Sequence, residues 1–113
     1  MGKIVKGDVI VLPFPFSDLS NSKRRPAVVI AALEGEDIIL CQVTSQERFD
    51  SYSIPLAISD FKEGSLPVDS FIRPNRLFTA DQKIILYKAG SLKNLKMDEV
   101  DEKIIQIIRG RRN

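Results

Sequence analysis

The chain has 113 residues, of which 43% are hydrophobic and 28% are charged, as in one soluble globular domain. We therefore expect a single domain over residues 1–113. With 17 basic and 15 acidic residues, the net charge of +2 is too small to indicate nucleic-acid binding by itself. The single cysteine excludes an intrachain disulfide, and no secretion signal or membrane-length apolar stretch is visible, so we expect a cytoplasmic protein without a membrane partner.

The segment from residue 7 to residue 30 predicts a strand, a polar loop and a second strand. Residues 8–12 are rich in β-formers, residues 17–24 are polar, and residues 27–30 form a continuous apolar run. Because proline has no N–H to donate to a sheet, we expect Pro26 to be the first residue of the second strand. This places Arg25 at the mouth of that strand, where its guanidinium suits a phosphate.

The next part of the chain predicts more short strands, typical of a small barrel or sandwich. The only cysteine, Cys41, lies in one of these apolar runs, and we expect it to be a buried and unreactive strand residue. In chain order the patterns predict a hairpin turn at 34–37, a strand at 38–43, a loop at 45–51, an edge strand at 52–58, a loop at 61–67, a strand at 68–73 that ends before Pro74, and a strand at 84–88 that Ala89 and Gly90 end.

The C-terminal segment predicts a helix instead. From Met97 onward, apolar residues recur with helical spacing, and Gly110 is a plausible stop. Acidic residues between 98 and 102 fill the first turns and Arg109 closes the end, which complements the helix dipole. The sequence therefore predicts a mainly β fold with one C-terminal helix.

Five short motifs occur along the chain ahead of this helix. They are Gly7-Asp8, Arg25-Pro26, Val43-Thr44-Ser45, Ser70-Phe71-Ile72-Arg73 and Arg76-Leu77-Phe78-Thr79-Ala80-Asp81. In this order they resemble the PemK/MazF family of toxins from bacterial type II toxin–antitoxin pairs. The resemblance implies a small SH3-like barrel of the CcdB/MazF type and a sequence-selective endoribonuclease (an mRNA interferase) that cleaves single-stranded RNA without metal or cofactor. It also implies a homodimer and a cognate antitoxin, which we expect to be a small acidic protein.

Three residues are the predicted catalytic groups. Arg25 is expected to hold the phosphate and stabilise charge on it, and the Thr44 hydroxyl to donate to a phosphate oxygen. The resemblance adds Arg73, the arginine of an Arg-x-Asp pair in some relatives. Here Asn75 stands where those relatives have the aspartate and cannot act as a base, and the chain has no histidine. Because RNA carries its own nucleophile in the 2′-OH, we expect catalysis mainly through geometry and charge.

Other polar, basic and aromatic residues near these positions are expected to bind the RNA. Among Phe14, Phe16 and Phe78, Phe16 opens the first loop and is the preferred candidate for stacking on a base. The predicted substrate-binding residues are Phe16, Ser17, Lys23, Arg24, Ser45, Gln46, Asn75 and Arg76. With no histidine, one cysteine and scattered acids, the sequence predicts no metal site.

Two alternatives stay open at this stage. One is a module of the same fold that binds RNA or an antitoxin with weak or no catalysis, which Asn75 and the lack of histidine favour. The other is a toxin directed at DNA gyrase on the same barrel. Such toxins usually act through C-terminal aromatic residues, which the tail at 108–113 lacks.

Overall fold

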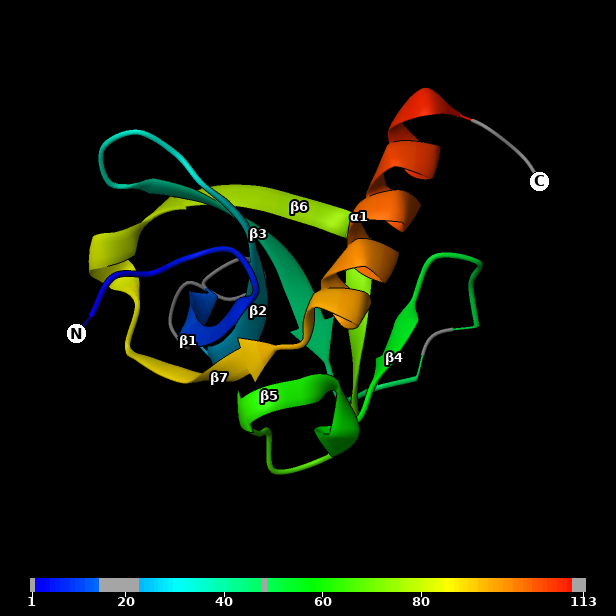
Figure 1. The fold of residues 1–113 in the computed structure, drawn as a ribbon, viewed down its shortest axis with the longest axis horizontal. Helices are drawn as coiled ribbons and strands as arrows, with labels where there is room; N and C mark the ends of the chain where they lie inside the picture. The colour runs from blue at the N-terminus through cyan, green and yellow to red at the C-terminus, as the bar shows by residue number, and fades with distance from the viewer. Residues whose placement is uncertain (1, 15–22, 48, 111–113) are drawn as a thin grey trace.

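A curled antiparallel sheet of seven strands makes up most of this computed structural model, which describes residues 2–14, 23–47 and 49–110, and the helix lies across one face of the sheet (Figure 1). In the sheet the strands follow the order β4-β6-β3-β2-β1-β7-β5. The elements are β1 (Asp8–Phe14), β2 (Lys23–Ala32), β3 (Asp37–Thr44), β4 (Ile54–Leu56), the 3₁₀ turn η1 (Ile58–Asp60), β5 (Phe61–Gly64), β6 (Ser70–Asp81), the 3₁₀ turn η2 (Gln82–Ile84), β7 (Tyr87–Leu92) and α1 (Asn94–Arg109).

The sheet curls far enough to approach a closed barrel. Its two edge strands, β4 and β5, are joined in sequence by the short turn η1 alone. The predicted mainly β fold with one C-terminal helix is confirmed. In the part of the chain that the structure describes, no helix has both the length and the apolar character needed to cross a membrane.

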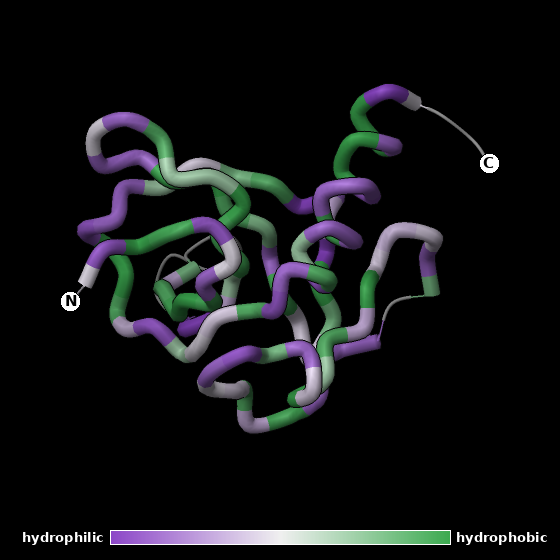
Figure 2. Tube along the Cα trace, viewed as in Figure 1, coloured by the Kyte–Doolittle hydropathy of each residue, from purple (hydrophilic) through white to green (hydrophobic). Residues whose placement is uncertain are grey.

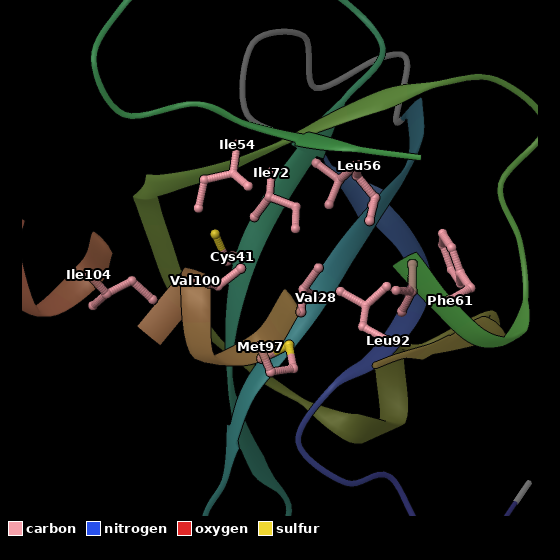
Figure 3. Packing of buried hydrophobic residues seen from close by; sticks show 12 residues of the cluster. Val28, Cys41, Ile54, Leu56, Phe61, Ile72, Leu92, Met97, Val100 and Ile104 are labelled. Carbon is pink, nitrogen blue, oxygen red and sulfur yellow. The ribbon is translucent and has the colours of Figure 1, made fainter. Parts of the chain in front are cut away.

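The sheet has a hydrophobic core on each face, because side chains alternate along its strands. On the face under α1, Met97 and Val100 of the helix pack against Val28 and Cys41 of the sheet (Figure 3). The opposite face carries a second core built around residues such as Leu40. Apolar residues lie along the central strands, and hydrophilic residues lie in the turn between β2 and β3 (Figure 2).

Both prolines that were expected to bound a strand lie inside one. The prediction that Pro26 begins the second strand is wrong, because β2 begins at Lys23 and Pro26 pairs with Val11 of β1. Pairing with β3 begins only at the next residue, so the missing N–H of Pro26 removes no bond from that ladder. The prediction that a strand ends before Pro74 is also wrong, because β6 continues to Asp81 and takes Pro74 out of the ladder in a bulge.

Two more boundaries differ from the sequence prediction for a shared reason. Residues 61–64, expected in a loop, form β5, and the last strand, expected at 84–88, is β7 at Tyr87–Leu92. These two strands pair so closely that a Cβ on Gly90 would lie 2.5 Å from the Glu63 carbonyl oxygen. Gly90 therefore permits the strand pair instead of ending a strand.

The helix begins earlier than its apolar pattern suggested. It starts at Asn94, so its first turn holds no acidic residue and the expected acidic complement to the dipole at that end is absent. The C-terminal prediction is confirmed. Gly110 adopts φ 68°, and its N–H donates to the carbonyls of Gln106 and Ile107.

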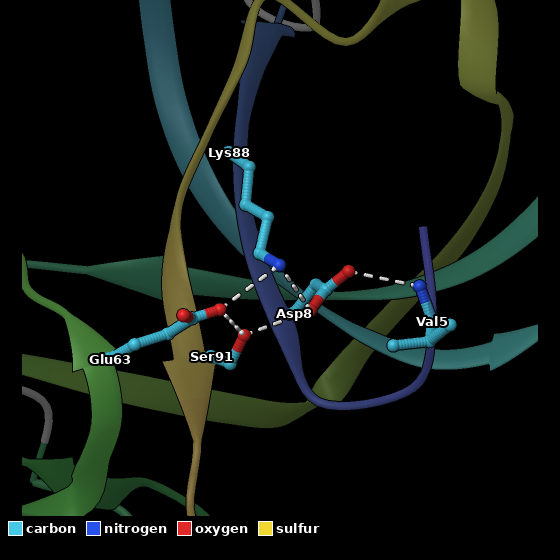
Figure 4. Close-up of polar contacts among 5 residues, drawn as sticks. All are labelled: Val5, Asp8, Glu63, Lys88 and Ser91. Atoms are coloured by element: carbon cyan, nitrogen blue, oxygen red, sulfur yellow. Dashed lines mark hydrogen bonds and ion pairs between the residues drawn. The ribbon is translucent and has the colours of Figure 1, made fainter. Parts of the chain in front are cut away.

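The Gly7-Asp8 motif has a structural role. The Asp8 side chain is 1% exposed, and its carboxylate accepts hydrogen bonds from the Val5 N–H (2.9 Å) and the Ser91 hydroxyl (3.1 Å) (Figure 4). The Lys88 ammonium lies 3.3 Å from both Asp8 and Glu63. Its hydrogen bond to Glu63 raises the pKa of Lys88 and lowers the pKa of Glu63. This network joins the N-terminal turn to β1, β5 and β7.

Replacing Asp8 with alanine should destabilise the fold. The change would leave the Val5 N–H without its acceptor, whereas the Ser91 hydroxyl would keep Glu63 as its remaining acceptor. A lost partner such as that of Val5 costs about 1–3 kcal/mol in the free energy of unfolding. Urea denaturation would measure the loss. Asp98→Ala, on the exposed side of α1, is the matched control and should change stability little. Equal stability of the two variants would show that the network contributes nothing.

Candidate functional site

Arg25 and Thr44 lie on adjacent strands, just beyond the point where these strands pair. The β2–β3 pairing begins with Ala27 opposite Gln42, and Arg25 and Thr44 each lie two residues from that pair. Because residues two apart along a strand share a face of the sheet, Arg25 is on the face of Ala27 and Thr44 is on the face of Gln42, which is the same face. Both residues line a hollow of about 290 Å³ at this end of the sheet. The structure therefore brings together the first two predicted catalytic residues.

Arg73 joins them from the neighbouring strand. Strand β6 sets Phe71 opposite Thr44 and Arg73 opposite Gln42, so Arg73 is a diagonal neighbour of Thr44 on the same face. Its side chain is only 11% exposed, and its guanidinium lies 3.9 Å from the Asp50 carboxylate. Hydrogen bonds from the Ser53 and Tyr52 N–H groups, with a smaller effect of Arg73, lower the pKa of Asp50. Arg73 is thus held by a carboxylate that stays charged.

A three-residue bulge in β6 determines this position of Arg73. Strand β3 pairs Gln42 with Arg73 and the preceding Cys41 with Leu77, which leaves residues 74–76 without partners in β3. The Cys41 thiol donates a hydrogen bond to the Arg73 carbonyl oxygen at 2.9 Å. Burial raises the pKa of Cys41 to about 12, so the thiol keeps its proton and remains a donor. The prediction that Cys41 is a buried strand residue is confirmed.

Thr44 is more buried than its place at a strand end suggested. It is 6% exposed, and its Oγ1 accepts a hydrogen bond from the Gln46 N–H at 3.1 Å. This bond fixes the oxygen and leaves the hydroxyl proton available for donation. Thr44 lines the hollow at the side of the sheet where β2 begins and β3 ends.

The predicted substrate-binding residues divide into several groups. Arg24 and Ser45 line the same hollow as Arg25 and Thr44. Arg76 lines a second hollow of about 260 Å³ instead. Lys23, Gln46 and Asn75 are exposed, and Phe16 and Ser17 lie outside the described residues.

Sequence reasoning missed Tyr87 and Ser70, which also line the first hollow. Tyr87 comes next to the site because β1 pairs Val11 with it, across more than seventy residues of sequence. The sequence around Tyr87 has no feature that distinguishes it from other strand residues. Only the strand order identifies it as a neighbour of Arg25.

The arginines around both hollows keep their charge exposed to a ligand. Arg24, Arg25 and Arg76 make no ion pair with any residue that the structure describes, whereas Lys88 and Lys96 each contact two carboxylates. A guanidinium without a carboxylate partner is available to a phosphate. Within the described ranges, no group of three acidic or cysteine side chains is placed to hold a metal ion. The site thus suits a polyanion bound by arginine.

A family model for the PemK-like, MazF-like toxin of type II toxin–antitoxin systems matches residues 5–108. The chain belongs to this family. No curated protein matches it. The predicted family and the toxin class are thus confirmed.

Solved structures share this toxin's fold at low sequence identity. An endoribonuclease in complex with its cognate antitoxin from Mycobacterial species has 10% identity and a TM-score of 0.77, and the match covers 98% of this chain and 100% of that one. MazE-MazF (Form-III) from Deinococcus radiodurans has 17% identity and a TM-score of 0.74, with 96% and 98% covered. The Mycobacterium tuberculosis toxin MazF-mt6 has 11% identity and a TM-score of 0.69, with 94% and 99% covered. The predicted CcdB/MazF-type fold is confirmed.

Proposed function

We propose that this toxin is a metal-independent endoribonuclease that cleaves single-stranded RNA. One observation carries the proposal, namely that Arg25 and Thr44 line one hollow and that Arg73 lies diagonally across from Thr44 on the neighbouring strand. Two arginines and a hydroxyl are the groups that stabilise a phosphate on which charge develops. Membership of a toxin family and the endoribonucleases with the same fold support the same activity.

In the proposed reaction the RNA supplies the nucleophile. The 2′-oxygen attacks the adjacent phosphorus, the bond from phosphorus to the 5′-oxygen breaks, and the products are a cyclic phosphate and a free 5′-hydroxyl. The proton lost from the 2′-OH and the proton gained by the 5′-oxygen are exchanged with water, since the chain has no histidine. Arg25 and Thr44 hold the phosphate oxygens, and Arg73 adds positive charge beside them. Orientation of this kind can lower a barrier by about 7–11 kcal/mol.

Arg25→Ala should abolish most RNA cleavage while the protein stays folded. Removing one preorganised charge donor typically lowers the rate about 10²–10³-fold. The assay uses a long single-stranded RNA with EDTA present, since the proposed site needs no metal. A matched control is Arg109→Ala, an exposed arginine in the last turn of α1.

The same assay examines the nucleophile. A 2′-deoxyribose at the nucleotide before a cut should block that cut alone. Near-normal cleavage by folded Arg25→Ala, cleavage of an all-deoxy substrate, or dependence on magnesium would contradict the proposed mechanism. RNA binding without cleavage by the unmodified protein would indicate a binding module.

We also propose that the toxin forms a two-fold homodimer and is neutralised by a small acidic antitoxin. The described chain exposes large apolar side chains beyond the site, with Phe49 at 96% and Ile108 at 72%, and a self-complementary contact would cover such groups. Structures with this fold have been solved with an antitoxin bound. The basic surface formed by Lys23, Arg24, Arg25 and Arg76 suits an acidic segment. Arg73 does not belong to this surface, because it is buried beside Asp50.

Sedimentation should therefore show a dimer at micromolar concentration, and the antitoxin should displace RNA. Added salt should weaken RNA binding more than antitoxin binding, because counterion release dominates the first and apolar burial contributes to the second. Binding of a fluorescent RNA at rising salt, with and without antitoxin, measures both. A monomer at this concentration, or a ternary complex with RNA still bound, would contradict the arrangement.

A further inference from the structure

We propose that the second hollow binds one nucleobase of the RNA and that the Gln42 amide reads the edge of that base. This inference rests on the proposed function, because it assumes that single-stranded RNA enters the neighbouring site. The hollow measures about 260 Å³, just below the ~300–1,000 Å³ typical of pockets for drug-sized ligands, which suits a single planar base. It is lined by Phe14, Gln42, Arg76, Leu77 and Phe78.

The position of Gln42 connects this hollow to the proposed cleavage site. Gln42 precedes Thr44 by two residues on β3, so the two side chains lie on the same face, about 7 Å apart along the strand. Gln42 also faces Ala27 on β2 and Arg73 on β6. A base above Gln42 therefore belongs to a nucleotide next to the phosphate that Arg25 and Thr44 hold.

Two aromatic rings form an apolar wall of the hollow. Phe14, at the end of β1, and Phe78, on β6, meet edge to face, with ring centroids 5.1 Å apart and an angle of 78° between the rings. Phe14 is buried and Phe78 is half-buried, so Phe78 offers the larger accessible ring surface. Bases stack on aromatic side chains in single-strand binding sites, and this contact tolerates every base. The wall thus provides binding, and selectivity needs a polar group.

Gln42 is that polar group. Its side chain is half-buried, and no described residue forms a hydrogen bond with its amide. The amide offers a donor and an acceptor side by side, the arrangement that glutamine uses to contact adenine at N6 and N7. In single-stranded RNA these base edges are open to such contacts. We therefore assign adenine as the base that the hollow prefers.

Arg76 supplies the charge at the edge of this hollow. It belongs to the bulge of β6, is exposed, and makes no ion pair with a described residue. A guanidinium there can hold the backbone phosphate of the nucleotide whose base enters the hollow. The hollow therefore combines stacking, base reading and phosphate binding within one nucleotide.

Gln42→Glu tests the inference, because glutamate can only accept hydrogen bonds and favours the amino group of cytosine. The substrates are RNA oligonucleotides that differ only in the nucleotides flanking one cut. We expect the unmodified toxin to prefer adenine at one flanking position, and Gln42→Glu to lower that preference about tenfold and shift it toward cytosine. Gln42→Ala should lose the preference without gaining a new one. Gln106→Glu, on α1, should leave the sequence profile unchanged.

Several results would overturn the inference. One is an unchanged cleavage preference in folded Gln42→Glu and Gln42→Ala. Another is an equal loss of cleavage at every RNA sequence, which would indicate that Gln42 has a structural role. A variant that loses only antitoxin affinity would assign the hollow to that protein. If the unmodified toxin cleaves nothing, the proposed function fails, and affinity for adenine-containing against adenine-free oligonucleotides tests the hollow alone. An adenine preference in binding that Gln42→Glu removes would support it.

Discussion

The bulge in β6 is the constraint on which the rest of the site depends. On an unbroken strand, residues with even numbers stay on one face of the sheet. Here Ile72 packs in the core under α1, whereas Phe78 packs against the core on the opposite face. Residues 74–76 allow β6 to change faces. Between Arg73 and Leu77 the chain advances four residues on β6, while β3 advances one residue between their partners Gln42 and Cys41. Strand β6 therefore contributes side chains to both hydrophobic cores. Arg73 directly precedes the bulge, and Arg76 is its last residue.

Local sequence patterns predicted the elements that local physics determines. The strands around residues 8–12, 27–30 and 38–43 were correct, as was the helix with its glycine stop, since each carries its own period or cap. The pattern could not predict β5, a short polar segment that becomes a strand only because β7 lies beside it. It also could not predict that β6 runs through Pro74, because the bulge is defined by its partner β3. For the proposed site, the sequence pattern and the resemblance predicted Arg25, Thr44 and Arg73, whereas Gln42 and Tyr87 depend on strand register and carry no local signal.

Charges are divided between the scaffold and the two hollows. Asp8, Lys88 and Glu63 satisfy one another, and Lys96 contacts Asp60 and Glu99 where α1 meets η1. The pairs of Lys88 with Glu63 and of Lys96 with Glu99 reach solvent and contribute little to stability, whereas the Asp8 carboxylate is buried. These ion pairs matter mainly for where charge is left over. The acidic residues of the scaffold pair with its lysines, so the arginines at the hollows have no carboxylate partner in the described structure. A nearly neutral chain thus acquires a local positive field, which attracts a polyanion.

The titratable groups beside the site also explain why geometry must carry the proposed reaction. The pKa of Asp50 is lowered and that of Cys41 is raised to about 12, so neither group exchanges a proton near neutral pH. Without such a group, rate must come from alignment of the 2′-oxygen with phosphorus and from the charge of the arginines. Alignment depends on how the nucleotide is held, and a base fixed in the second hollow holds it at one end while Arg25 and Thr44 hold the phosphate. In this scheme sequence selectivity and catalytic rate have one physical origin, since a base that fits poorly also misaligns its own 2′-oxygen.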